Sequence, residues 1–246
     1  MIGRTEGVGK HTSYYELRDA LAQEGCALCH LAQRAVERFL DNLLYENVND
    51  PGVRRDVRQA RGFCNLHAWQ LRDQRGALGI AILHRDVLST VTERVQKTQP
   101  ADARPTPLLR VRAPLVTARP MPAAATLASD LAPQRICLAC QTREDAEEIY
   151  IHVLLEHIND PEITEGFSRS GSLCLPHFRR VLQQVRDEAT ARRLIAMQLG
   201  AWEQLLAELD EFIRKQDYRF RDEGLGAEGD SWIRAVARVS GERKVW

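Results

Sequence analysis

Apolar residues recur every three to four positions along most of the chain, which is the spacing of one face of an α-helix. Between residues 28 and 48 the positions with this spacing are Leu31, Ala35, Phe39 and Leu43. The same spacing returns in the second half of the chain, at Ile149 and Val153. No segment has the strict alternation of apolar and polar residues that marks a half-buried strand. The pattern therefore predicts an all-α protein.

Helix boundaries are marked twice by the same tripeptide. Asn49-Asp50-Pro51 and Asn159-Asp160-Pro161 are each typical of the end of a long helix and the start of a short one. In both, Asp is suited to the N-cap and Pro to the first helical position, while Gly62 and Gly171 are suited to end the short helices. Further helices are expected over residues 64–73, 78–97, 174–187 and 189–215, with a short amphipathic turn around Trp232, Ile233 and Val236.

A longer pattern repeats across the two halves of the chain. A Cys-x-x-Cys pair, the Asn-Asp-Pro tripeptide and a Cys-x-x-His pair follow one another between residues 26 and 67, and again between residues 137 and 177. Cys137 follows Cys26 by 111 residues and Cys174 follows Cys64 by 110, so one single-residue insertion or deletion aligns the copies. Chance rarely places so many special residues in register. We interpret the chain as two tandem, pseudo-symmetric copies of one helical module.

A proline-rich segment separates the two copies. Seven of the ten prolines lie between residues 100 and 133, among many alanines and few large apolar residues, which is the composition of a linker. We therefore expect a first module at residues 1–98 and a second module with a C-terminal tail at 134–246. The Pro/Ala-rich linker at 99–133 is expected to lie outside both cores as an extended or poorly ordered connection.

Composition limits the compartment and the partners. The 34 lysines and arginines balance the 34 aspartates and glutamates, which argues against a protein that follows a nucleic-acid phosphate backbone. Neither residues 1–10 nor any later segment is apolar for long enough to act as a signal peptide or to cross a bilayer. We expect a cytoplasmic protein without a membrane partner, in which the six cysteines bind metal instead of forming a disulfide framework.

The cysteines and two of the histidines form pairs whose members are three residues apart. Two such pairs complete the shell of one tetrahedral ion, and we expect each module to close its own Cys₃His site. The predicted ligands are Cys26, Cys29, Cys64 and His67 in the first module, and Cys137, Cys140, Cys174 and His177 in the second. Cys₃His is a common structural zinc composition, and a helix N-terminus favours the thiolate over the thiol. The sequence thus predicts two zinc ions per chain.

Other chemistries use similar cysteine patterns. Cys26-Ala-Leu-Cys29-His30 spells a c-type haem attachment motif, but Gln141 replaces the histidine in the second copy, and such haem belongs to exported chains. A thioredoxin-like Cys-x-x-Cys needs a βαβ context that the chain lacks. An iron–sulfur protein or a thiol-based redox sensor stays an open alternative, because Cys₃His ligands alone do not distinguish a cluster from zinc.

Other conspicuous side chains have ordinary structural explanations. Arg54, Arg58 and Arg61 share a helix face, and we interpret that face as solvated because the matching segment at residues 162–169 lacks it. The aromatic residues that we expect to fill cores, or the joint between modules, are Phe39, Tyr45, Trp69 and Trp202.

Several motifs resemble those of a known family. They are Tyr14-Tyr-Glu-Leu-Arg-Asp-Ala-Leu21, Gly25-Cys26-Ala-Leu-Cys29, Asn49-Asp-Pro51, Gly62-Phe-Cys64-Asn-Leu-His67-Ala-Trp69, Gly79-Ile-Ala-Ile-Leu83 and Leu173-Cys-Leu-Pro-His-Phe178. Across most of the chain outside the linker, the sequence resembles a prokaryotic family catalogued only as a domain of unknown function. The resemblance implies a duplicated, cysteine-rich helical protein, and it implies no reaction or substrate.

The ligand count bears on catalysis. Four protein ligands leave a metal no open position for water, which argues against a metal-dependent hydrolase. No Ser-His-Asp set, phosphate loop or Gly-rich nucleotide motif indicates another kind of enzyme. We therefore expect a non-catalytic zinc-binding helical protein whose surfaces, or the cleft between its modules, bind a protein or a small ligand.

Overall fold

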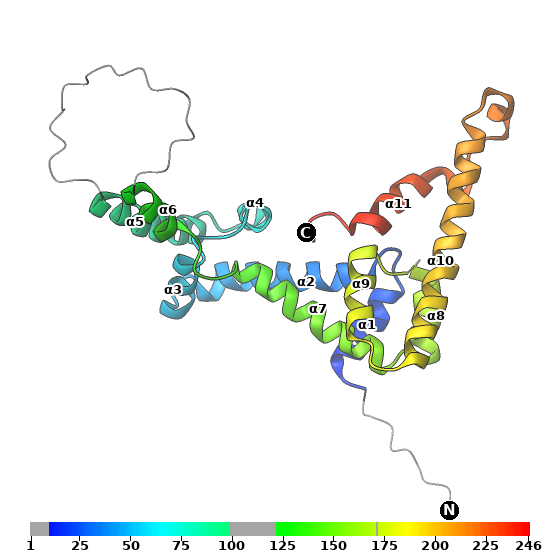
Figure 1. Cartoon of the computed structure of the whole chain (residues 1–246), viewed down its shortest axis with the longest axis horizontal. Helices are drawn as coiled ribbons and strands as arrows, with labels where there is room; N and C mark the ends of the chain where they lie inside the picture. The colour runs from blue at the N-terminus through cyan, green and yellow to red at the C-terminus, as the bar shows by residue number, and fades with distance from the viewer. Residues whose placement is uncertain (1–9, 99–121, 171) are drawn as a thin grey trace, which may run out of the picture. The chain divides into compact units, whose positions relative to one another are not determined.

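The structure is a computed structural model that describes residues 10–98, 122–170 and 172–246 (Figure 1). Within these ranges every regular element is a helix, which confirms the all-α prediction. The α-helices are α1 (Thr12–Leu21), α2 (Ala27–Asn42), α3 (Pro51–Gln59), α4 (Asn65–Asp73), α5 (Ala77–Thr98), α6 (Pro122–Leu131), α7 (Leu138–Glu156), α8 (Pro161–Ser170), α9 (Leu175–Gln184), α10 (Glu188–Lys215) and α11 (Ser231–Ser240). A π-helical turn spans Leu43–Asn47, and 3₁₀ turns span Tyr218–Glu223 and Ala227–Asp230. None of these described helices is long and apolar enough to cross a membrane.

Both Asn-Asp-Pro sequences start a short helix, as expected. Asp50 lies at the N-cap of α3, where its Oδ1 accepts a hydrogen bond of 2.7 Å from the backbone N–H of Val53. Asp160 precedes α8, and its Oδ1 accepts a hydrogen bond of 3.0 Å from the N–H of Glu162. Each carboxylate therefore satisfies one of the amide groups that a helix start leaves without an intrahelical partner. The long helices α2 and α7 follow the two Cys-x-x-Cys pairs, also as expected.

A π-helical turn accommodates the one-residue difference between the repeats. Cys29 and Glu46 are 17 residues apart, whereas Cys140 and Glu156 are 16 residues apart. The longer copy is the one in which residues Leu43–Asn47 are π-helical. A π turn bonds residue i to residue i+5 and so holds one more residue than an α turn. The extra residue is thereby absorbed without breaking the helix that leads to the Asn-Asp-Pro sequence.

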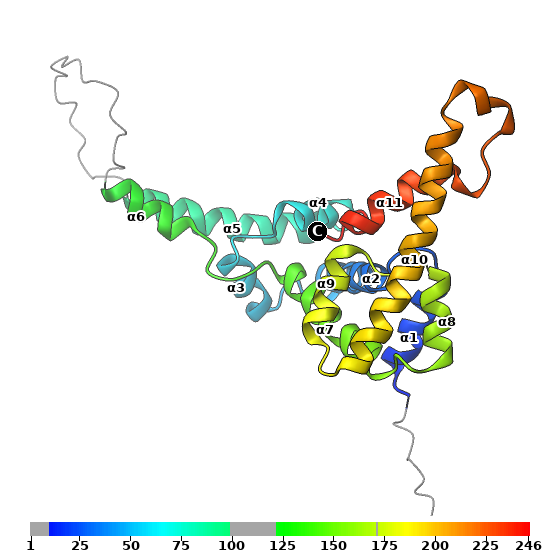
Figure 2. The ribbon, with the colours of Figure 1, turned by 45° about the vertical axis from the view of Figure 1, so that its right-hand side comes forward.

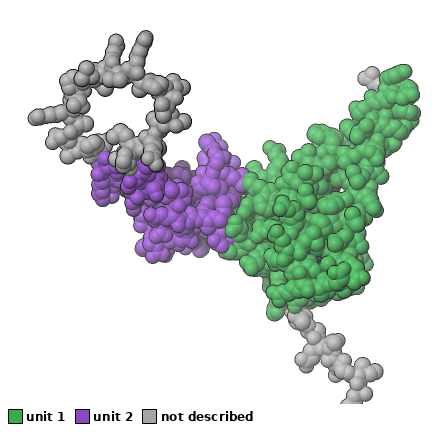
Figure 3. Space-filling view, viewed as in Figure 1, with its two compact units in different colours: residues 1–38, 142–246 green, residues 39–141 purple. Residues whose placement is uncertain are grey.

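The chain forms two compact units, each of which takes segments from both repeats (Figure 3). Unit 1 comprises residues 1–38 and 142–246, and unit 2 comprises residues 39–141. The boundaries fall inside α2 and α7, so each long helix starts in one unit and ends in the other. The compact units therefore do not coincide with the expected modules. The physical reason is helix length, because the 16 residues of α2 rise about 24 Å and carry the following chain away from the first cysteine pair.

The core of unit 1 lies among α1, α8, α9 and α10, which gather together in two views, and it includes residues from the start of α2 and from α7 (Figures 1 and 2). Its almost fully buried side chains include those of Tyr14, Leu17, Ile151, Leu154 and Phe167. Burying each such side chain stabilises the fold by about 1.5–3 kcal/mol. Helices α1 and α8 approach closely at Gly166, where a Cβ atom would lie 2.9 Å from the Cβ of Leu21. Only a residue without a side chain fits this contact.

In unit 2, both α3 and α6 pack on α5. Arg54 donates two hydrogen bonds of 2.7 Å to the carboxylate of Asp86 on α5, and Arg58 donates a third of 3.0 Å. Arg61 donates hydrogen bonds to the backbone oxygens of Arg58 and Asp130. The arginine face that was expected to be solvated therefore joins helices, Arg54 and Arg58 through ion pairs with Asp86 and Arg61 through hydrogen bonds to backbone oxygens.

Part of the expected linker is helical. Residues 122–131 form α6 and pack on α5, so this part of the segment is not extended. The alanines of α6 are strong helix formers, and Pro122 occupies the first helical position, where proline is tolerated. Residues 99–121 of the expected linker lie outside the described residues.

Two of the aromatic predictions are wrong. The side chain of Trp69 is 59% exposed and that of Tyr45 is 87% exposed, so neither fills a core. Periodicity identifies a helix, but apolar residues also occur on its exposed face. Phe39 is half-buried. Trp202 packs on the core of unit 1, where its ring lies 5.3 Å from the ring of Phe178.

Candidate metal centres

Four of the predicted ligands converge in unit 1, where we call them site 1. Cys26 and Cys29 come from the start of α2, and Cys174 and His177 come from the start of α9. All four side chains are buried. The Nδ1 atom of His177 lies 3.4, 3.3 and 3.2 Å from the sulfurs of Cys26, Cys29 and Cys174, and the sulfurs of Cys29 and Cys174 are 3.6 Å apart. The four ligand atoms thus surround one point.

The other four predicted ligands converge in unit 2, as site 2. Cys64 and His67 come from the start of α4, and Cys137 and Cys140 come from the start of α7. The Nδ1 atom of His67 lies 3.2, 3.7 and 3.3 Å from the sulfurs of Cys64, Cys137 and Cys140. The sulfurs of Cys64 and Cys140 are 3.6 Å apart and only half-buried. Site 2 is therefore more accessible to solvent than site 1.

The pairing of the ligands differs from the expected one. Each site combines the Cys-x-x-Cys pair of one repeat with the Cys-x-x-His pair of the other, so the expectation that each repeat closes its own site is wrong. The cause is the path of α2 and α7, because each helix leaves its cysteine pair in one unit and continues into the other. Ligand spacing within a pair is the same in either arrangement. The sequence pattern therefore identified the pairs without identifying their partners.

One local rule positions all four pairs. Cys64 and Cys174 have extended backbones at the N-caps of α4 and α9, and each accepts the first helical hydrogen bond on its carbonyl oxygen. The second ligand of each pair is then the third helical residue, which lies on the same side of the first turn as the N-cap. Cys26 and Cys137 precede α2 and α7 in the same way. The positive end of each helix dipole favours the thiolate form of these cysteines.

The distances fit a single tetrahedral ion. Zinc–sulfur bonds of about 2.3 Å and zinc–nitrogen bonds of about 2.0 Å give tetrahedron edges of about 3.5–3.8 Å. The ligand atoms of both sites are 3.2–3.7 Å apart along the measured edges. A disulfide would hold its two sulfurs about 2.05 Å apart, which excludes a disulfide at either site. The residues present therefore fit one metal ion per site.

The titration of the ligands also calls for a cation. Burial, together with the charge of Cys137, raises the pKa of Cys140 to about 12. In site 1, hydrogen bonds to Cys174 and Cys26 raise the pKa of Cys29 as well. Burial lowers the pKa of His177, but hydrogen bonds to Cys174 and Cys26 outweigh it and raise that pKa to about 9. Several thiolates in one buried cluster repel each other, and a metal ion at the centre would remove this penalty.

Sequence reasoning did not find Glu147, which supports site 1 from α7. Its side chain is completely buried, and its Oε1 lies 3.3 Å from the Nε2 of His177 and 3.5 Å from the Nε of Arg143. Its Oε2 forms an ion pair with Arg180. His177 thus turns Nδ1 to the sulfurs and Nε2 to a carboxylate, the arrangement that orients metal-binding histidines in proteins. The indication that the sequence offered was that Glu147 lies two helical turns after Cys140 in the same predicted helix.

The C-terminal segment covers site 1. The ring of Trp246 lies 5.1 Å from the ring of His177, and the Arg143 guanidinium lies 4.8 Å from the Trp246 ring. The backbone N–H of Glu242 lies 3.5 Å from the sulfur of Cys29, and the side chain of Val245 is buried. Because this segment separates site 1 from solvent, the last residues of the chain belong to the site. The sequence pattern did not indicate this role.

Comparison with known proteins identifies a family and a relative of this chain, but neither is described with a reaction. The model of a family of unknown function (DUF6062) matches residues 13–245. A protein of Caldicellulosiruptor sp. (strain Rt8B.4), described as an uncharacterized 23.9 kDa protein in the xynA 3′ region, is 26% identical over 206 residues, which cover 80% of this chain and 85% of the relative. No solved structure matches the chain.

Proposed function

The chain belongs to the DUF6062 family, and we propose that it is a non-catalytic protein in which two structural zinc ions fix the helices for a binding role. The observation that carries the proposal is the closed Cys₃His geometry of both sites. Four protein ligands fill a tetrahedral shell and leave no position where water or substrate could be activated. An ion in such a shell stabilises structure.

The ligand spacing supports a single ion over an iron–sulfur cluster. In a cluster the thiolates bind different iron atoms and are held apart by the cluster itself. Here the ligand atoms of each site all lie within 4.8 Å of one another. Among the ions that accept tetrahedral sulfur and nitrogen ligands, zinc is the usual structural one. Site 1 would hold its zinc through Cys26, Cys29, Cys174 and His177, and site 2 through Cys64, His67, Cys137 and Cys140.

Exposed apolar side chains in unit 1 support the binding role. Leu206 on α10 is 58% exposed, and Val236 and Val239 on α11 are 60% and 62% exposed. Leu206 and Val239 help to line an apolar cavity of about 360 Å³, together with Trp202. Contiguous exposed apolar surface on a water-soluble fold commonly marks an interaction site. The proposed partner surface therefore includes α10 and α11.

Elemental analysis of protein purified without chelator tests the metal part of this proposal. We expect two zinc ions per chain, no inorganic sulfide and no visible absorbance. If the protein instead contained iron and inorganic sulfide, the zinc proposal would be wrong and the iron–sulfur alternative would be favoured. Fewer than two metal ions per chain would contradict the proposal that both sites bind metal. The structural role is tested by chelation, which should lower the free energy of unfolding because metal-binding energy becomes folding energy.

A further inference from the structure

Helix α10 carries a heptad pattern of apolar residues that the rest of unit 1 only partly covers. The steps between these residues alternate between four and three, which is the spacing of a seam along which two helices pack. The seam residues are Ile195, Leu199, Trp202, Leu206, Leu209 and Ile213. Leu199, Leu206 and Ile213 are 47%, 58% and 65% exposed. The seam therefore offers an open apolar surface, about 27 Å long, to another helix.

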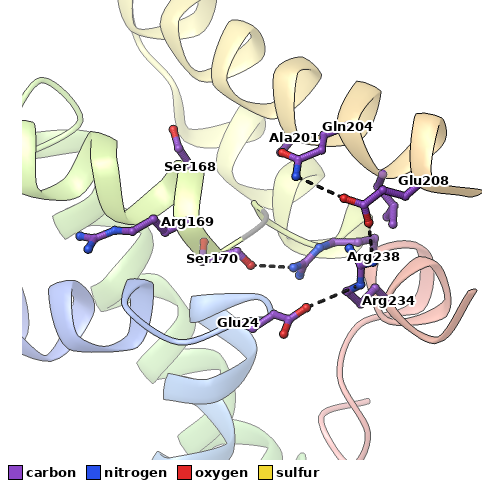
Figure 4. A pocket seen from close by; sticks show the side chains of 10 residues that line it. Glu24, Ser168, Arg169, Ser170, Ala201, Gln204, Glu208, Arg234 and Arg238 are labelled. Atoms are coloured by element: carbon purple, nitrogen blue, oxygen red, sulfur yellow. Dashed lines mark hydrogen bonds and ion pairs between the residues drawn. The ribbon is translucent and has the colours of Figure 1, made fainter. Parts of the chain in front are cut away.

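Helix α11 makes the seam one side of a groove. The apolar cavity of about 360 Å³ is lined by seam residues of α10 and by Val239 of α11. Polar contacts fix α11 in this position (Figure 4). Arg234 of α11 forms an ion pair with Glu208 of α10, and Arg238 donates a hydrogen bond of 2.7 Å to the backbone oxygen of Ser170. The groove is therefore formed before any partner binds.

Two acidic side chains flank the seam without an ion pair. Glu203 and Asp210 each follow a seam residue directly, lie seven residues apart on α10 and are exposed. Neither of them forms an ion pair with another described residue. When two helices pack along such a seam, the flanking residues of one helix face those of the other, and opposite charges there select the partner. The partner helix is therefore expected to be basic at its flanking positions.

A second copy of this chain would not supply these basic residues. The other row that flanks the seam of α10 is uncharged and consists of Gln198, Leu205 and Phe212. Parallel pairing of two copies of α10 would place Glu203 and Asp210 beside this uncharged row, and antiparallel pairing would place them beside each other. Like charges that face each other across an interface oppose association. The flanking charges thus favour a helix of a different protein.

We propose that the groove between α10 and α11 binds an amphipathic helix of a partner protein. The apolar residues of that helix contact the seam, and its flanking lysines or arginines pair with Glu203 and Asp210. Recognition of a helix in a groove uses apolar anchors at spacings of three, four and seven residues, which the seam of α10 matches. This inference rests on the proposed binding role and adds the chemistry of the partner.

A synthetic peptide of three heptads is the probe, with leucine at every seam position and lysine at every flanking position. Its binding to the full-length protein, whose metal content is measured in the same sample, is followed by fluorescence anisotropy at constant ionic strength. The comparison peptide has glutamate in place of each lysine. We expect saturable binding of the lysine peptide and at least about tenfold weaker binding of the glutamate peptide, the combined effect of two exposed charge pairs and their reversal.

One pair of variants tests the apolar contact. Leu206→Ala should weaken binding of the lysine peptide by about tenfold, because a central apolar anchor loses its contacts. Leu206 is largely exposed, so the variant should fold like the wild type. Ile149→Ala is the matched control, because Ile149 is an exposed apolar residue of the same unit that does not line the groove. The control should bind the lysine peptide like the wild type.

A second pair of variants tests the charges. Glu203→Lys combined with Asp210→Lys should reverse the preference, so that the glutamate peptide binds more tightly than the lysine peptide. Glu148→Lys combined with Glu165→Lys is the matched control, because it changes the net charge equally at two exposed residues of unit 1 outside the groove. This control should keep the preference of the wild type for the lysine peptide.

Several outcomes would overturn the proposal. They are absence of saturable binding of the lysine peptide, equal binding of the two peptides, and unchanged binding in Leu206→Ala or in the Glu203/Asp210 variant. A dimer that is seen by sedimentation equilibrium and dissociates in Leu206→Ala would also overturn it, because the groove would then hold a second copy. All altered residues lie outside both metal sites. The zinc content of every variant should therefore equal that of the wild type, which separates failure of this inference from failure of the zinc proposal.

Discussion

The exchange of ligand pairs between the repeats can be tested by counting zinc in double variants. Cys26→Ser combined with Cys174→Ser removes two ligands from site 1 and leaves site 2 complete, so we expect one zinc ion per chain. Cys26→Ser combined with Cys64→Ser removes one ligand from each site, so we expect neither site to retain zinc against a chelator. If each repeat closed its own site, these two results would be interchanged.

The contribution of each ion to the free energy of unfolding can be estimated from the length of the loop that the ion closes. Site 1 joins Cys29 to Cys174, which are 145 residues apart, and site 2 joins Cys64 to Cys140, which are 76 apart. Treated as cross-links that restrict the unfolded chain, they contribute about 5 and about 4.5 kcal/mol of loop-closure entropy. The total stability of a typical domain is about 5–15 kcal/mol. Loss of one ion should therefore unfold the unit that contained it.

The assay combines elemental analysis after dialysis against a chelator with thermal denaturation of the same samples. His30→Gln serves as the control, because His30 is adjacent to Cys29 but is not among the ligands of either site. This control should retain two zinc ions and melt like the wild type. One retained zinc ion in the Cys26/Cys64 variant, together with none in the Cys26/Cys174 variant, would refute the exchanged pairing.

Three further predictions concern single side chains. Glu147→Gln should weaken zinc binding at site 1 by about 10–100-fold and leave site 2 unchanged, as measured by competition with a chromophoric chelator; equal loss at both sites would contradict its role. Asp50→Ala should lower the free energy of unfolding in urea by about 1 kcal/mol with both zinc ions retained, whereas loss of zinc without loss of stability would contradict the N-cap role. Burial and a hydrogen bond to Glu16 raise the pKa of Tyr150 to about 12, so the stability from this contact is present below about pH 10 and is lost as pH rises through 12. Tyr150→Phe should therefore be less stable than the wild type at neutral pH, and should lack the last tyrosine to ionise in an ultraviolet titration.

The features that local chemistry determines were predictable from the sequence. The caps at Asp50 and Asp160 follow from the needs of a helix start, and the long helices follow from apolar periodicity. The two ligands of each pair are adjacent in the first turn of a helix, so their spacing was sufficient to identify them as a pair. Each of these inferences involves residues that are near one another in the chain.

The features that depend on distant segments were not predictable. The Cys-x-x-His pair that lies opposite Cys26 and Cys29 is determined by the paths of α2 and α7. The spacing of the ligands in the sequence says little about the length of these helices, so it does not predict the pairing. Glu147 becomes a partner of His177 only when α7 and α9 are packed together. No periodicity or motif places Trp246 against the same histidine ring. These contacts result from tertiary packing.

The exchanged pairing also governs the order in which a growing polypeptide can load its metals. Cys64, His67, Cys137 and Cys140 are all added to the growing chain before Cys174, so the ligands of site 2 are complete first. Cys29 must wait for a partner 145 residues downstream, which takes roughly 7–30 s at typical elongation rates. During that interval two thiols of the nascent chain lack their final partners and are open to oxidation or to the wrong histidine. Translation speed and zinc supply would thus act together on the yield of correctly assembled protein.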